Sequence, residues 1–323
     1  MSTEVQVPLP IVVRLNAAIV AVTDGTPRIL TLQGKDARPT LPFGQLDAER
    51  DRTLELGVRR WVRERTGLEL GYVEQLYTFG DLNRELSEPA RVLSVTYLAL
   101  IRERELPASP GVWWQGWYRL FPWEDHRTGR PEMIESTILP ALEDWADGAG
   151  TEASAGQRRD RIAIAFGAGT SHWDPERALD RYELLWEAGL VEEFHQDLAI
   201  SSSAPLDLDG VQLVPGRPLA YDHRRITATA ISRIRGKIQY RPVVFELLPE
   251  VFTLLQLQQV VEALSGTRLH KQNFRRLVER AGLVEGTGKT TGTGGRPAEL
   301  FRFRRDVLLE RPAPGVGLPG VSL

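Results

Sequence analysis

The sequence contains no cysteine, only two methionines and only five histidines. Without cysteine, the chain can form no disulfide, no thiolate metal site and no cysteine nucleophile. None of the histidines has another histidine four residues away, so a histidine-based metal site has little support. No apolar run approaches the ~20 residues that cross a bilayer, and the first residues lack the basic segment of a secretion signal. We therefore expect a cytoplasmic protein with no membrane contact and no metal site.

Charge is divided unevenly along the chain. The 323 residues are 42% apolar and 26% charged, which is ordinary for a protein with two well-packed domains. Residues 222–311 contain 17 Lys and Arg against 9 Asp and Glu, a surplus of eight, although the whole chain has a formal net charge of −3. The remaining residues therefore carry a net charge of −11. This asymmetry indicates that the C-terminal part contacts a polyanion and that the N-terminal part does not.

Residues 252–303 carry the pattern of a winged helix. Thr253 and Gln256 have the spacing of a capping box, in which a hydroxyl caps a helix start and the third residue of the helix reaches back. The pattern predicts a first helix that starts directly after Thr253 and stops at Gly266, where a positive φ is expected. A second helix is predicted over residues 270–282, because apolar residues recur there at helical spacing.

The second of these helices is the candidate for reading DNA. Gln and Arg have bidentate geometry for adenine and guanine edges, and a helix of this length fits the major groove. The Gly- and Thr-rich residues that follow, and the alternating residues up to 303, predict a hairpin wing. The expected DNA-contacting residues are Lys271, Gln272, Asn273, Arg275 and Arg276 on the helix, Thr253 at a helix start, and Lys289 and Arg296 on the wing. The structural alternatives are a solvated charged helix face, local capping by Asn273, and a role of Arg296 in fixing the wing.

The N-terminal part mixes strands and helices. Residues 10–33 contain two apolar runs separated by Asp24 and Gly25, which predicts a hairpin. The crowded aromatic residues over 113–121 are expected to fill a core rather than to stack on a ligand. The other elements expected here are a helix over 53–66 and strands over 75–79 and 92–101.

The middle of the chain predicts less regular structure. Residues 147–157 are Gly, Ala, Ser and Thr without periodicity and read as a flexible connection. Residues 161–166 look like a strand before a Gly-x-Gly turn, where a tight turn is favoured over a dinucleotide fingerprint. The remaining expectations are a helix that starts at Asp174 and Pro175 and ends near Gly189, a strand over 211–214, a helix from Asp222 to about residue 238, and a mobile tail over 312–323.

Residues 41–68 resemble a Nudix box, a loop and helix in which glutamates bind magnesium for pyrophosphate hydrolysis. When the box is aligned on Gly67, its arginine falls at Arg60, its inner glutamates fall at Trp61, Glu64 and Arg65, and its earlier glutamate falls at Arg52. Only Glu64 of the ligand set is kept, and the spacing from Gly44 is two residues too long. Arginine in place of carboxylates removes magnesium ligands and adds repelling charge. We expect a nucleotide pocket without hydrolysis.

Further segments are similar to the Nudix-related transcriptional regulators of NAD metabolism. They are residues 74–81, 91–100, 219–223, 235–242, 252–254, 271–276 and 295–303. The long insertion at about 115–218 and the degenerate box make the resemblance to NrtR-like regulators greatest for the alphaproteobacterial NadQ-like branch. The resemblance implies an α+β protein with a Nudix-like α/β/α sandwich over 1–221, a winged helix-turn-helix domain over 222–311 and a flexible tail over 312–323.

The resemblance also implies a function. It indicates a homodimeric, non-enzymatic repressor of NAD biosynthesis genes, with a palindromic operator and a nucleotide effector such as NAD, ATP or ADP-ribose. No catalytic cofactor is expected. Arginine would suit the phosphates of the effector and aromatic rings its adenine. The candidate effector-binding residues are Phe43, Arg60, Trp61, Glu64, Tyr77 and Phe79, although core packing explains Trp61 and Phe79 equally well.

Two other hypotheses stay open. The chain is an active Nudix hydrolase of ADP-ribose or NADH fused to a DNA-binding domain if Glu49, Glu55 and Glu64 serve as an unusual ligand set. It is a scaffold if the winged domain binds protein instead of DNA. The salt dependence of binding distinguishes a scaffold from a DNA-binding protein, because binding to DNA through several phosphates weakens steeply as the salt concentration rises.

Overall fold

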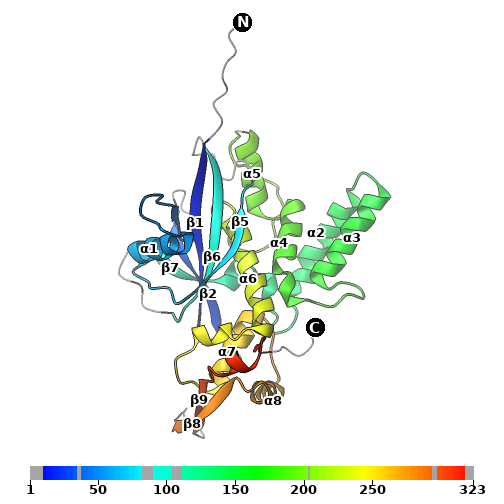
Figure 1. Ribbon diagram of the computed structural model, residues 1–323. Helices are drawn as coiled ribbons and strands as arrows, with labels where there is room; N and C mark the ends of the chain where they lie inside the picture. Colours follow the sequence, from blue (N-terminus) through cyan, green and yellow to red (C-terminus); the bar gives the residue numbers. More distant parts are fainter. Residues whose placement is uncertain are drawn as a thin grey trace.

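The computed structural model describes residues 10–34, 38–81, 90–103, 106, 111–202, 204–292 and 297–316. A twisted sheet lies at the centre with helices on both sides, and a small unit made of the C-terminal residues lies below it (Figure 1). The α+β fold is confirmed. The strands are β1 (Ile11–Thr23), β2 (Thr26–Gln33), β3 (Pro39–Thr40), β4 (Phe43–Gln45), β5 (Tyr72–Phe79), β6 (Arg91–Leu100), β7 (Val112–Gly116), β8 (Val284–Thr291) and β9 (Ala298–Phe303). The α-helices are α1 (Leu54–Thr66), α2 (Leu139–Asp147), α3 (Glu152–Phe166), α4 (Ala178–Glu187), α5 (Glu192–Ser202), α6 (His223–Tyr240), α7 (Leu254–Ser265), α8 (Lys271–Ala281) and α9 (Val307–Glu310).

The large sheet has the strand order β3-β2-β1-β6-β5, with β4 paired to β1 and β7 paired to β2. β1 and β6 are parallel and in register from Ile11 opposite Arg91 to Val20 opposite Leu100. The predicted hairpin of β1 and β2 is confirmed. Its two-residue turn, Asp24 and Gly25, takes φ values of 50° and 67°, which suits the tight turn that joins twisted antiparallel strands.

Helix α1 packs on one face of the sheet through Val58 and Val62, which are almost fully buried. The predicted helix is confirmed at both ends. The Thr53 hydroxyl accepts a hydrogen bond from the Leu56 backbone N–H, and Gly67 ends the helix with φ at 67°. The other face of the sheet is covered by α6, so the sheet lies between helices (Figure 1).

The residues between the two units form helices that the sequence analysis missed. The flexible connection expected over 147–157 and the strand expected over 161–166 are wrong, because both stretches contribute to α3. Thr151 caps α3, and Ile162 and Phe166 are buried while Ile164 is 48% exposed, which is a helical rather than an alternating pattern. The strand expected over 211–214 is also wrong, because these residues form no regular element. The helix predicted after Asp174 is confirmed as a 3-10 turn (Pro175–Arg177) followed by α4.

The aromatic region is core, as expected at most positions: Trp117 and Phe121 are fully buried, and Trp113 and Trp114 are half-buried on β7. The expected mobile tail is wrong for its first part. Val316 is fully buried, and its backbone N–H donates to the Ile238 carbonyl (2.9 Å), so residues 312–316 run along the end of α6. The rest of the expected tail lies outside the described residues.

Candidate nucleic-acid interface and nucleotide site

The two helices of the winged unit have the predicted ends. Thr253 and Gln256 form the capping box: the Thr253 hydroxyl accepts from the Gln256 backbone N–H (3.2 Å), and the Gln256 side chain accepts from the Thr253 backbone N–H (2.8 Å). Thr253 is only 7% exposed, so its side chain is occupied within the helix start. Gly266 ends α7 with φ at 74°, and Gly282 ends α8 with φ at 61°.

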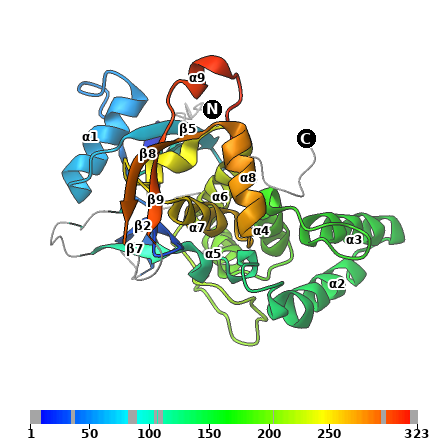
Figure 2. The ribbon, with the colours of Figure 1, turned by 90° about the horizontal axis from the view of Figure 1, so that it is seen from below.

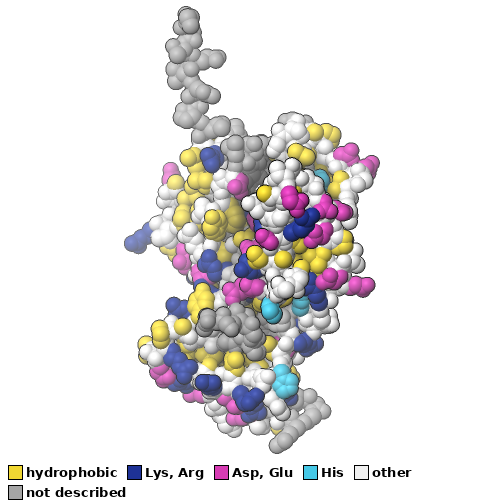
Figure 3. Space-filling model, turned by 90° about the vertical axis from the view of Figure 1, so that its right-hand side faces the viewer, with side chains coloured by type: hydrophobic (Ala, Val, Ile, Leu, Met, Phe, Trp, Pro, Cys, Tyr) yellow, Lys and Arg dark blue, Asp and Glu magenta, His cyan; other side chains and the backbone are white. Residues whose placement is uncertain are grey.

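Helix α8 presents one apolar face and one polar face. Phe274 and Val278 are buried against the unit, and the residues predicted to contact DNA point to solvent. Three of these side chains already have local partners: Arg275 donates to Glu279 (2.8 Å), and Arg276 donates to Asn273 (2.5 Å). The exposed set on α8 is Lys271, Gln272, Asn273, Arg275 and Arg276. Lys and Arg side chains are scattered over the surface of the lower part of the molecule, where this unit lies (Figure 3).

The predicted hairpin wing is formed by β8 and β9. Lys289 is exposed on β8, and Arg296 lies outside the described residues. The wing is tied to the start of α7 by a reciprocal pair of backbone hydrogen bonds between Phe252 and Phe301 (2.9 and 2.8 Å). The wing and the helices therefore form one unit, with α8 on its outer side (Figure 2).

The candidate effector residues fall on two sides of the large sheet. Phe43 is opposite Asn16, Asn16 is opposite Thr96, and Thr96 is opposite Tyr77, so the four side chains form one row across β4, β1, β6 and β5. The Phe43 ring contacts the His223 ring of α6 with centroids 5.4 Å apart, which places this row on the face toward α6. Tyr77 is 59% exposed, whereas Phe79, on the same face, is buried in the core.

This row contains residues that sequence reasoning missed. Asn16 and Thr96 are buried polar residues, and within the described part of the chain the Thr96 hydroxyl has no hydrogen-bond partner. A buried hydroxyl of this kind is a group that a ligand can satisfy. Tyr221 also lies against Phe43, at 5.8 Å between ring centroids, and its φ of 58° is unusual for a residue with a side chain. Nothing in the local sequence signals these contacts, because they join segments far apart in the chain.

Arg60 and Glu64 lie instead on the solvent side of α1. Arg60 donates to both carboxylate oxygens of Asp51 (2.8 and 2.9 Å) and also to Glu64 (3.0 Å). The hydrogen bonds from Arg60 hold the pKa of Asp51 below its usual value. Trp61 packs against Gly44, where an added Cβ would meet the indole nitrogen at 1.8 Å, so it serves the packing of α1 on β4. The structure thus separates Arg60 from Phe43, Tyr77 and Phe79 of the predicted site.

The carboxylates of the degenerate box are held by arginines. Glu55 pairs with Arg59 (2.9 Å), and Glu64 pairs with Arg60 (3.0 Å). Among the described residues no group of three or more His, Asp or Glu side chains is placed to hold a metal ion. Within the same residues no helix is long and apolar enough to cross a membrane.

A buried ion-pair network joins the helical insertion to α6. Glu124, in the 3-10 turn Pro122–Glu124, pairs with Arg181 of α4 (2.6 Å) and with Arg235 of α6, and all three side chains are at most 1% exposed. Burial alone would raise the pKa of Glu124, but the two arginines outweigh it and hold the pKa at about 2. The carboxylate is therefore charged at neutral pH and fixed between two helices.

The same network reaches the winged unit. Arg235 donates to the Leu264 carbonyl at the end of α7 (3.0 Å), and the hydroxyl of Tyr118 donates to the Ala263 carbonyl (2.7 Å). The backbone N–H of His126 donates to the Gly266 carbonyl (2.8 Å). The last carbonyls of α7 are thus held by the insertion and by α6, so the winged unit is fastened to the rest of the molecule at this end.

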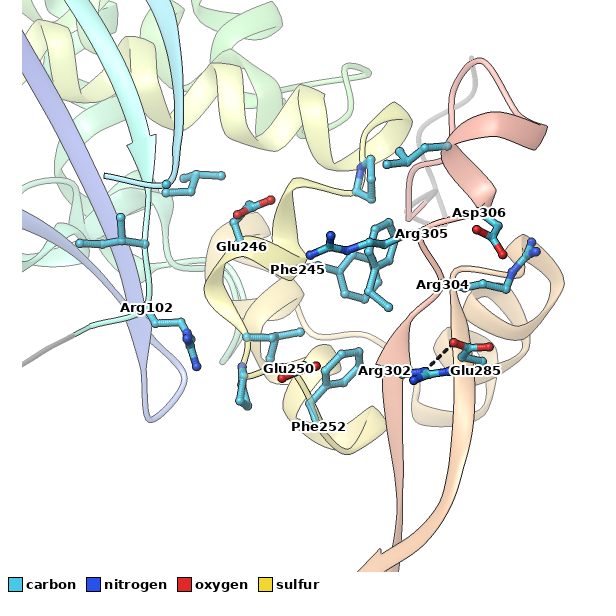
Figure 4. A pocket seen from close by; sticks show the side chains of 18 of the residues that line it. Arg102, Phe245, Glu246, Glu250, Phe252, Glu285, Arg302, Arg304, Arg305 and Asp306 are labelled. Atoms are coloured by element: carbon cyan, nitrogen blue, oxygen red, sulfur yellow. Dashed lines mark hydrogen bonds and ion pairs between the residues drawn. The ribbon is translucent and has the colours of Figure 1, made fainter. Parts of the chain in front are cut away.

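A cavity of about 1070 Å³ lies between the wing and the end of β6. Arg102 lines the cavity from the sheet, Glu246 and Phe245 line it from the segment before α7, and the Glu285–Arg302 ion pair lines it from the wing (Figure 4). The winged unit is therefore held through the end of α7 and through the packing of α7 on β1 and β2, while the space beside the wing is open.

Comparisons with known proteins agree with this architecture. Residues 244–303 match the family model described as the NrtR DNA-binding winged helix domain. The ADPR responsive transcriptional repressor NtrR of Acinetobacter baylyi is 39% identical over 85 residues, which are 26% of this chain and 34% of that protein. The chain thus aligns with about a third of the length of this curated relative.

Three solved structures share the fold over most of the chain. NrtR of Shewanella oneidensis matches with a TM-score of 0.55 and 21% identity, covering 91% of this chain and 95% of that one; its complex with a 27mer DNA matches with a TM-score of 0.51 and 22% identity, covering 91% and 94%. A MutT/nudix family protein from Enterococcus faecalis matches with a TM-score of 0.53 and 17% identity, covering 94% and 90%. The resemblance to NrtR-like, Nudix-related proteins is confirmed: residues 244–303 match the NrtR winged-helix model, and the chain shares its overall fold with NrtR and with a MutT/nudix family protein.

Proposed function

We propose that this protein is a transcriptional repressor of NAD biosynthesis genes that binds operator DNA through α8 and the wing. The observation that carries the proposal is the exposed row on α8, where Lys271, Gln272 and Arg275 point to solvent on the helix that follows the anchored end of α7. The matched winged-helix family and the crystallised DNA complex of the Shewanella oneidensis protein support DNA as the partner. In this proposal residues 222–311 read DNA and residues 1–221 sense the effector.

The effector in this proposal is a nucleotide, and ADP-ribose is the first choice. The name of the Acinetobacter baylyi relative supports ADP-ribose over NAD and ATP. Phe43 and Tyr77, with the unpartnered hydroxyl of Thr96 between them, provide aromatic and polar contacts on the face toward α6. Because α6 runs from this face to the last carbonyls of α7, a ligand that shifts the start of α6 also shifts the winged unit.

The protein acts as a homodimer on a palindromic operator in this proposal, since two-fold symmetry presents two reading helices to two half-sites. It is not an enzyme. Glu55 and Glu64 each pair with an arginine one turn away, so among the three carboxylates of the alternative ligand set only Glu49 forms no ion pair, which is too few ligands for magnesium.

The proposal is tested with an operator recovered by selection from a random duplex library. Arg275→Ala should weaken binding of this operator by about tenfold to hundredfold, from the ~1–3 kcal/mol of a good base contact, as measured by fluorescence anisotropy. Arg241→Ala, at the exposed end of α6, is the matched control and should leave the affinity unchanged. If the Arg275→Ala variant binds the operator with wild-type affinity, α8 is not the helix that reads DNA.

The sensing role has its own test. ADP-ribose, NAD and ATP are titrated into the protein–operator complex, and a change in operator affinity with at least one of them supports sensing. The same samples are incubated with magnesium and analysed for products. Turnover of ADP-ribose that is lost in Glu64→Gln would establish the hydrolase alternative and overturn the non-enzymatic role.

A further inference from the structure

Residues 219–223 form an elbow that leads from the helical insertion into α6. Two hydrogen bonds join this elbow to the segment that carries Phe43. The backbone N–H of Ala220 donates to the Pro39 carbonyl (2.9 Å), and the backbone N–H of Leu41 donates to Nδ1 of His223 (3.0 Å). His223 is only 2% exposed, so this hydrogen bond is shielded from water. The elbow and the segment around Phe43 are therefore tied together.

Three aromatic rings complete this contact. The centroid of the Phe43 ring lies 5.4 Å from that of His223 and 5.8 Å from that of Tyr221. The centroids of the Tyr221 and His223 rings are 5.3 Å apart. We call the four residues Leu41, Phe43, Tyr221 and His223 the clasp. Phe43 also begins the row that ends at Tyr77, so a change in the row reaches the clasp through this ring.

The backbone of the clasp is strained at Tyr221. Its φ of 58° is left-handed, and among the described residues Asp24, in the turn between β1 and β2, is the only other non-glycine residue with a positive φ. A β-carbon crowds the following carbonyl in this conformation, so the conformation persists only where the surroundings enforce it. The contacts with Phe43 and His223 enforce it here. Loosening these contacts lets the elbow relax to an ordinary backbone conformation.

Helix α6 connects the clasp to the winged unit. His223 is the first residue of this helix, and Arg235, about three turns further on, donates to the Leu264 carbonyl at the end of α7. The helix is continuous between these two residues (Figure 1). A turn of α6 at its first residue therefore displaces the end of α7 and, with it, the reading helix α8.

We propose that His223 is the positioning residue that sets where the winged unit lies, because its hydrogen bond with Leu41 ties the Phe43 row to the start of α6. This inference rests on the proposed sensing role of that row and specifies how the role is carried out. The Thr96 hydroxyl is fully buried, so a ligand reaches it only when the row opens. Phe43, which is half-buried, is the ring of the row that borders the clasp. Displacement of Phe43 removes the support of the elbow and lets α6 turn.

The test measures the position of the winged unit without ligand and without DNA. Because the chain has no cysteine, Leu56→Cys on α1 and Arg280→Cys on α8 give two unique exposed positions for spin labels. His223→Phe keeps a ring beside Phe43 but offers no acceptor to the Leu41 N–H, so it should shift or broaden the distribution of distances between the labels. His223→Asn should keep the wild-type distribution, because its Oδ1 accepts in place of Nδ1.

A matched control and a second measurement separate positioning from simple damage. His195→Phe makes the same exchange of rings within the insertion and should leave the distances unchanged. Operator affinity is then measured by fluorescence anisotropy with and without ADP-ribose. The two affinities should differ by about fivefold to 150-fold in the wild type and in His223→Asn, the usual range of coupling between sites, and should be nearly equal in His223→Phe. A residue with only a structural role would weaken both affinities and leave their ratio unchanged.

The proposal is overturned if folded His223→Phe keeps the wild-type distances, or if His223→Asn or His195→Phe shifts them as far as His223→Phe does. Thermal unfolding shows whether each variant is folded. If His223→Phe is not, Phe43→Leu takes its place, since it removes a ring from the other side of the clasp, and unchanged distances in that variant overturn the proposal. If no nucleotide changes the operator affinity of the wild type, the sensing role fails, and the distances measured without ligand still decide the role of His223.

Discussion

Arg235 and Glu124 form an ion pair that is sealed from solvent and connects α6 to the helical insertion. The same guanidinium donates to the last turn of α7 through the Leu264 carbonyl (3.0 Å). The pair therefore lies where three parts of the molecule meet: the insertion, the long helix and the winged unit. Its loss affects the position of the winged unit as well as the stability of the fold.

Glu124→Gln is expected to destabilise the protein strongly. It leaves Arg181 and Arg235 buried without a counter-charge, which costs about 3–5 kcal/mol in the free energy of unfolding. Urea denaturation followed by circular dichroism measures the change. The control is Glu64→Gln, which removes an exposed carboxylate from a surface pair and is worth about 0–1 kcal/mol. Similar stability losses in the two variants would show that the buried network is unimportant.

Acid should loosen the joint between the insertion and α7 through His126. Burial lowers the pKa of His126 to about 4, although the nearby charge of Glu124 opposes this shift. The unfolded chain takes up a proton on this residue near pH 6.5 and the folded state only near pH 4, so stability falls as the pH drops from about 6.5 to about 4. Unfolding measured across this window should show a shallower slope in His126→Gln. The exposed control His270→Gln should keep the wild-type slope.

Asp197→Asn should stabilise the protein in alkaline buffer. Burial raises the pKa of Asp197 to about 6, while a hydrogen bond from the Trp186 indole (3.2 Å) partly offsets this shift. The folded state therefore holds this proton more tightly than the unfolded chain. The favourable contribution is complete below about pH 3.8 and is lost as the pH rises through about 6. Asparagine keeps an acceptor for Trp186, so we expect a gain at pH 8 of at most about 3 kcal/mol, reduced by solvent screening because the carboxyl is only partly buried, and none near pH 3. An equal gain at both pH values would refute the role of this carboxyl.

The segment that ends at Val316 should detach when Gly315 receives a side chain. A Cβ at Gly315 would meet the Gln239 carbonyl at 2.0 Å, so Gly315→Ala cannot keep the backbone of this segment against α6. Loss of the buried Val316 side chain should lower the free energy of unfolding by about 1–2 kcal/mol. Hydrogen exchange should show faster exchange at Val316. Gly150→Ala, where the added Cβ meets no atom within 4 Å, should leave both measurements unchanged.

Two neighbouring residues of α8 should affect DNA binding in different ways. Gln272→Ala should relax discrimination at one base pair by about 1–3 kcal/mol, because an amide reads a base edge. Lys271→Ala should weaken binding to all sequences alike and lower the salt slope by about one, because an ammonium group contacts phosphate. Competition with single-base variants of the selected operator, repeated at several salt concentrations, distinguishes the two effects.

The parts of the fold that the sequence predicted are those with local signals. Thr253 and Gln256 specify the start of α7 within one helical turn, and Gly67 and Gly266 end their helices with the backbone freedom expected of glycine. Helix α3 was missed because its small and polar residues show no clear apolar period, and its burial against α2 and α4 decides its structure.

The same distinction between local and tertiary signals applies to the candidate sites. The outward residues of α8 followed from helical spacing, which needs only the local sequence. The candidate effector residues lie on two sides of the large sheet, because a Nudix-like pattern locates the helix and the strands but not the face on which each side chain lies. The pairing of Asp51 with Arg60, and the edge-to-face contact of Phe43 with His223, depend on tertiary contacts that no spacing rule contains.

Helix α6 buries side chains on several sides, toward the large sheet, toward α4 and toward the end of α7. Cleavage between residues 221 and 222 would therefore expose apolar surface on each fragment, and neither fragment is expected to remain in solution by itself. The molecule should unfold in a single cooperative step rather than in two. Limited proteolysis should accordingly spare this helix until the whole chain is lost.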